Sequence, residues 1–178
     1  MLLRKINAWI SLATAVLLVG HAMLGAIEQL SRHRIPVPAP WMSSVLMGLM
    51  ITHAMLSIMM VLSHLEEAGE RRYRTYPNQN SATYAQRLTG VLMILLFALH
   101  YLGASNGLQS RILHAILHPL FYAVVFAHTG ISTNKALITL GFGNAKAIRV
   151  IGVVVRVICV TTLIVGLSGL YVELFAEV

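Results

Sequence analysis

The sequence predicts an all-α integral membrane protein in which five transmembrane helices form a bundle. Hydrophobic residues make up 57% of the 178 residues, and the mean hydropathy is +0.77. Both values place the chain in the membrane class. The charged residues lie mostly between apolar runs, so no separate soluble domain is expected. We therefore predict one membrane domain that covers residues 1–178.

Five apolar runs account for the predicted helices. They cover residues 8–30, 41–65, 88–104, 108–131 and 147–172. A helix rises about 1.5 Å per residue and the hydrocarbon core is about 30 Å thick, so four runs are comfortably long enough. The third run is short, and we expect flanking side chains such as Arg87 to reach the interface. The first run is too long for a signal peptide and is expected to be retained.

The distribution of positive charge predicts the orientation. Most cations fall on one side of the predicted bundle: Arg4, Lys5, Arg71, Arg72, Arg74, Arg87, Lys135, Lys146 and Arg149. Only Arg32, Arg34 and Arg111 fall on the other. By the positive-inside rule the N-terminus is cytoplasmic and the C-terminus is outside. We expect a multi-pass protein of a bacterial inner membrane.

The composition argues against several classes of function. The net charge is +7 and aspartate is absent, but the cations follow a topology pattern rather than forming a nucleic-acid groove. Cys159 is the single cysteine, so no disulfide framework or cysteine cluster is expected. No nucleophile motif or phosphate-binding loop is found in the sequence. Any reaction must therefore come from bound cofactors.

Eight histidines are the most informative residues of the chain. Seven lie within or at the ends of apolar runs: His21, His53, His64, His100, His114, His118 and His128. An ionisable residue inside a membrane suggests a function, and histidine is a common metal ligand and an axial ligand of heme iron. A single such histidine can also be an interhelical hydrogen-bonding residue, which we expect for His33 and His114.

Depth divides these histidines into an outer and an inner layer. Counted from the outer helix ends, His100 lies at about 10 Å, His21 and His118 at about 15 Å, and His53 at about 18 Å. His64 and His128 lie at about 30 Å or beyond. The inner layer has one pair, His64 with His128. The outer layer leaves two alternatives, His21 with His100 or His53 with His118.

Short motifs around four of the histidines carry a family resemblance. They are Gly20-His21-Ala22-Met23, His64 followed by Arg71-Arg72-Tyr73 and Pro77, Arg87 with Gly90, Phe97 and His100, and His128-Thr129-Gly130 followed by Ala136 and Leu140-Gly141. In this respect the chain resembles the single-subunit, five-helix, two-heme cytochrome b membrane anchors of succinate dehydrogenase and fumarate reductase. His53 and His118 are additional to the family's pattern.

The resemblance implies a function and a set of ligands. It assigns an outer heme b to His21 and His100 and an inner heme b to His64 and His128. It also implies that the chain transfers electrons between a cytoplasmic flavoprotein and iron–sulfur module and a membrane quinone, menaquinone or ubiquinone. The chain itself would not act on a dicarboxylate. The soluble partner's substrate, the direction of electron flow and the oligomeric state are left open.

Two further residues are candidates for a role in such a site. Arg156, about ten residues into the fifth helix, needs an anionic partner at that depth, and a propionate of the inner heme is one candidate. Snorkelling to the interface is the alternative. Glu28 lies two turns beyond His21 and is a candidate for proton exchange at a quinone site. As an interfacial carboxylate it needs no function, and this is the preferred interpretation.

Two other functions are alternatives to the cytochrome b membrane anchor. The chain would serve equally as the cytochrome b of another respiratory enzyme, of the hydrogenase or formate dehydrogenase type, and the soluble partner would separate these. A rival of another class is a non-redox, small-molecule-binding subunit of a transporter. Only that rival predicts a colourless protein.

Overall fold

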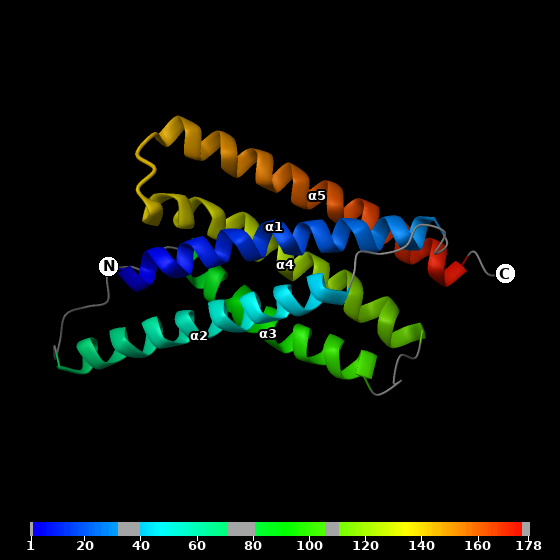
Figure 1. The fold of residues 1–178 in the computed structure, drawn as a ribbon, viewed down its shortest axis with the longest axis horizontal. Helices are drawn as coiled ribbons and strands as arrows, with labels where there is room; N and C mark the ends of the chain where they lie inside the picture. The colour runs from blue at the N-terminus through cyan, green and yellow to red at the C-terminus, as the bar shows by residue number, and fades with distance from the viewer. Residues whose placement is uncertain (1, 32–39, 71–80, 106–110, 176–178) are drawn as a thin grey trace.

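Five long helices make up the computed structural model (Figure 1). They are α1 (Leu2–Leu30), α2 (Pro40–Glu70), α3 (Ser81–Ser105), α4 (Arg111–Leu140) and α5 (Ala145–Phe175). The structure describes residues 2–31, 40–70, 81–105 and 111–175. At positions 29, 40, 64–70, 82, 101–105, 111–115 and 173–174 it describes the backbone alone.

Each of the five helices contains a stretch long and apolar enough to cross a membrane. The prediction of an all-helical bundle with five candidate membrane spans is therefore confirmed. Large apolar side chains are exposed along the helices, among them Val16, Met55, Val91, Val157 and Ile164. Lipid can cover such side chains at no cost, so their exposure fits a membrane-embedded bundle.

Two helices extend well beyond the predicted runs. α3 begins at Ser81 rather than at residue 88, and α4 continues to Leu140 rather than ending at residue 131. The apolar pattern ends where the chain becomes polar, but the backbone hydrogen bonds of a helix do not require apolar side chains. The third helix is consequently 25 residues long, although its candidate membrane span, Thr83–His100 with 18 residues, is the shortest of the five found among the described residues.

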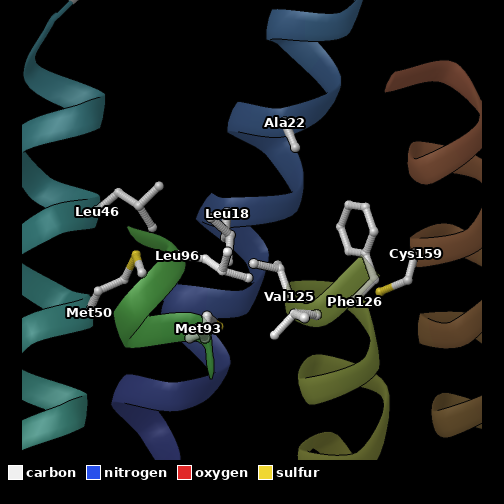
Figure 2. Packing of buried hydrophobic residues seen from close by; sticks show 10 residues of the cluster. Leu18, Ala22, Leu46, Met50, Met93, Leu96, Val125, Phe126 and Cys159 are labelled. Atoms are coloured by element: carbon white, nitrogen blue, oxygen red, sulfur yellow. The ribbon is translucent and has the colours of Figure 1, made fainter. Parts of the chain in front are cut away.

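α1, α4 and α5 pack against one another, and α2 and α3 pack on the outside of α1 and α4 respectively. α1 contacts α2 and α5, α4 contacts α3 and α5, and α1 also contacts α4. Figure 2 shows the buried centre, to which every helix contributes: Leu18 and Ala22 from α1, Leu46 and Met50 from α2, Met93 and Leu96 from α3, Val125 and Phe126 from α4, and Cys159 from α5. Cys159 is buried, as expected for a packing residue.

The turn between α4 and α5 is specified by its sequence. Gly141 adopts a positive φ of 96°, and the Phe142 amide donates to the Leu137 carbonyl at 3.1 Å. These features form a glycine C-cap. Asn144 then caps α5, because its Oδ1 accepts hydrogen bonds from the Lys146 and Ala147 amides at 3.0 Å each.

Candidate functional site

A cavity of about 840 Å³ lies in the half of the bundle that carries the N-terminus, between the α1–α2 pair and the α3–α4 pair. Its volume is within the range of natural small-molecule and cofactor sites. All four helices line it, and Met50 and Met93 belong both to its wall and to the buried core. Among its polar wall residues are the side chains of His53 and His128.

The imidazoles of His53 and His128 lie 6.5 Å apart, measured between ring centroids, with their planes at 68°. Two imidazoles bound on opposite sides of one metal ion, each at a metal–nitrogen distance of about 2 Å, would have centroids about 6 Å apart. The observed separation therefore leaves room for one metal ion between the two rings. The cavity beside them can hold the rest of a cofactor.

Asn7 fixes the orientation and tautomer of His53. The Asn7 Oδ1 atom lies 2.9 Å from His53 Nδ1, and the Asn7 amide nitrogen donates to Ser57 Oγ at 3.3 Å. Because the amide nitrogen faces the serine, the oxygen faces the imidazole and must accept. His53 therefore carries its proton on Nδ1, which leaves the lone pair on Nε2 for a ligand.

Thr89 likewise fixes the orientation and tautomer of His128. Its Oγ1 donates to the Ala85 carbonyl at 2.7 Å, so the hydroxyl accepts from His128 Nδ1 at 3.1 Å. His128 is thus also protonated on Nδ1. Metal-binding histidines typically donate their second ring nitrogen to a neighbour in this way, which fixes the ring and raises its basicity. Both histidines carry this arrangement.

Gly90 on α3 lies close to the His128 ring. A Cβ atom on Gly90 would lie 3.3 Å from His128 Cε1 and 3.7 Å from its Nδ1. A contact of 3.3 Å is tighter than ordinary van der Waals contact, so the imidazole would have to shift to accommodate a side chain at Gly90. The glycine in the Arg87–His100 motif therefore has a steric role in the site.

Substitution at Gly90 tests this contact. Gly90→Val should lower the free energy of unfolding by about 1–3 kcal/mol through overpacking, measured by denaturation in detergent. Gly48→Val is the matched control, because a Cβ at Gly48 meets nothing within 4 Å. Equal stability of the two variants would contradict the close fit.

Three other candidate ligands, His21, His100 and His118, do not line this cavity. His100 contacts His118 and Phe121, with ring centroids 5.0 Å and 5.8 Å apart. The His100–His118 separation is shorter than the about 6 Å that a shared metal ion requires. His21 is half-buried on α1. The side chains of His64 and His114, and all of His33, lie outside the described residues. The assignment of one heme to His21 and His100 and of another to His64 and His128 stays a prediction.

Arg156 and Glu28 lie away from the cavity wall. The Arg156 side chain packs against Gly130, and its Nε donates to the Gly152 carbonyl at 2.9 Å. This places it between α4 and α5, whereas the cavity lies between α1, α2, α3 and α4. Glu28 is half-buried near the end of α1, where its carbonyl accepts from the Ser31 hydroxyl at 2.9 Å.

Three site residues were not singled out from the sequence for a role at a ligand. They are Asn7, Thr89 and Lys135, whose side chains bond His53, His128 and α3 respectively. Each is a polar residue inside or beside an apolar run, which is the signal that could have identified them. Their partners are 39 to 52 residues away in the chain, so the sequence alone could not show which residues they contact.

In the part of the chain that the structure describes, no three His, Cys, Asp or Glu side chains are grouped as a metal site. A heme needs only two axial ligands from the protein, because the porphyrin supplies the other four. Comparison with protein-family models, curated proteins and solved structures finds no match to this chain. The cavity and the histidines in its wall are therefore the structural basis for proposing a function.

Proposed function

We propose that this protein is a b-type cytochrome of the membrane, with one heme in the cavity between α1, α2, α3 and α4. One observation carries the proposal. The rings of His53 and His128 lie 6.5 Å apart between centroids, and each is held through Nδ1, which leaves Nε2 as the nitrogen that could bind a metal. Two histidines in the same tautomer, both lining one large cavity, are better explained by ligation than by packing.

The chain's residues have distinct roles in this proposal. His53 and His128 would be the axial ligands, and Asn7 and Thr89 would hold their rings in place. Met50, Met93 and Phe97 in the cavity wall would exclude water from the ring system, which is one way a protein sets a heme potential. A bound heme would supply one-electron chemistry that no side chain of the protein offers.

The resemblance adds further proposals. His64 is the sequence-based alternative to His53 as the partner of His128, and a second heme at the other end of the bundle would use His21 and His100. The chain would then connect a cytoplasmic flavin and iron–sulfur dehydrogenase to a membrane quinone in a bacterial inner membrane. The family resemblance supports this role, and the positive-inside rule supports the orientation.

Heme content tests the proposal directly. Protein purified from heme-replete cells should show a b-type spectrum that changes on reduction, with two hemes per chain by pyridine hemochrome assay. A ratio near one would keep the cavity heme and remove the outer one. A colourless protein would overturn the proposal and favour a non-redox transporter subunit.

The proposed partner can be tested by copurification from the native host. Gentle detergent extraction should recover a flavoprotein and an iron–sulfur protein, and charge reversal at Arg71 and Arg72 should weaken that association. Charge reversal at Arg32 and Arg34, on the opposite predicted side, is the matched control. Recovery of a partner that depends on Arg32 and Arg34 instead would refute the cytoplasmic docking face.

A further inference from the structure

The cavity has one strongly cationic end. Arg4, Arg87 and Lys135 line it, and they come from α1, α3 and α4. Arg4 shares α1 with Asn7, which bonds His53. Arg87 shares α3 with Thr89, which bonds His128, and Lys135 shares α4 with His128 itself.

All three cations are displaced from the histidines in the same direction. Arg4 precedes Asn7 by three residues and Arg87 precedes Gly90 by three, which is about 4.5 Å along a helix. Lys135 follows His128 by seven residues, two turns of about 5.4 Å on the same face of α4. α1 and α3 run away from the N-terminal end of the bundle and α4 runs toward it (Figure 1). All three cations therefore lie closer than the two histidines to the N-terminal end of the bundle.

Neutral partners hold Lys135 in this position. Its Nζ donates to Thr83 Oγ1 at 2.9 Å and to Gln86 Oε1 at 2.8 Å. An ammonium has three protons to donate, and these two bonds use two of them. Among the described residues that line the cavity none is acidic, so the wall that the structure describes brings positive charge to this end without a carboxylate.

A cationic end on an otherwise apolar cavity favours a ligand that carries an anionic group at that end, because lysine and arginine form charge-assisted hydrogen bonds with carboxylates. We infer that Lys135, with Arg87 and Arg4, forms a carboxylate-binding end of the cavity that binds the acid groups of the cofactor. The inference depends on the proposed heme function, and it fixes how the cofactor is oriented. The propionates would lie at the N-terminal end, and the vinyl edge would face Met50 and Met93.

Reconstitution with two forms of one ligand tests the inference. Full-length protein from heme-deficient cells is titrated in detergent with hemin and with hemin dimethyl ester, whose acid groups are blocked, and binding is followed by the Soret band. The intact protein should bind hemin roughly ten- to a hundred-fold more tightly than the diester, as expected for charge-assisted hydrogen bonds. Lys135→Met should remove most of this preference, and Arg87→Gln part of it.

Lys146→Met is the matched control, because Lys146 is exposed on the first turn of α5 and outside the cavity, and it should keep the full preference. The comparison of hemin with the diester needs no variant, so it holds even if Lys135→Met fails to fold. Equal binding of the two forms by the intact protein would overturn the inference and leave the heme proposal standing. It would mean that other anions, such as lipid phosphates, occupy the cationic end. Binding of neither form would overturn both.

Discussion

Replacing His128 by alanine should remove the heme of the cavity completely. His128 is the ligand shared by both candidate pairs, His53 with His128 and His64 with His128, so no alternative partner can replace it. One heme signal should disappear from the reduced-minus-oxidised spectrum of the purified variant, and the heme-to-protein ratio should fall by one. His33→Ala, in the segment between α1 and α2, is the control and should leave the spectrum unchanged.

The second ligand is decided by comparing His53→Ala with His64→Ala. The 6.5 Å separation of His53 from His128 leads us to expect the same loss in His53→Ala as in His128→Ala. Loss of the heme in His64→Ala with retention in His53→Ala would restore the pair implied by the resemblance. It would also require α2 to shift away from the N-terminal end of the bundle when the heme binds, because α2 runs toward that end and His64 follows His53 along it.

Removing the side chains that hold the two imidazoles should have the next largest effect. Partners of this kind typically contribute 10- to 100-fold in metal affinity, so Asn7→Ala and Thr89→Val should each weaken heme binding by about that factor. Equilibrium titration of the heme-free protein measures the affinity, and a redox titration measures the midpoint potential. Thr89→Ser should rescue both, because it keeps the hydroxyl that accepts from His128.

Thr52→Val is the matched control for Thr89→Val. Thr52 also donates to a carbonyl of its own helix, at 2.8 Å to Gly48, but it is exposed and does not contact a histidine ring. Its replacement should change neither the affinity nor the potential. If Thr89→Val behaved like Thr52→Val, the hydrogen bond to His128 would have no role in the site.

The sequence determined the architecture of this protein because membrane insertion depends on local properties of the chain. Five long apolar runs separated by Pro36–Pro40, Asn106-Gly107 and other polar segments are enough to predict five helices. The structure confirms them. The helix ends were less accurate, since a helix such as α3 begins at Ser81, in the more polar sequence that precedes its apolar run.

The proximity of His53 to His128 was decided only by the tertiary structure. The depth count placed His53 and His128 about 12 Å apart, too far for one ligand. Counted from Pro40 and Arg111, where α2 and α4 begin, they lie 13 and 17 residues in, at about 20 Å and 26 Å. Helix tilt and side-chain reach can close a gap of that size, and neither is encoded by spacing in the sequence.

The residues that hold the site depend on tertiary structure in the same way. The sequence shows that Asn7, Thr89 and Lys135 are polar residues near membrane helices, which marks them as unusual. Only the packing of α2 on α1 and of α3 on α4 brings Asn7 to His53 and Thr89 to His128. Hydrophobic runs fix where each helix lies along the membrane normal, whereas contacts between helices fix their rotation and tilt, and a binding site depends on the latter.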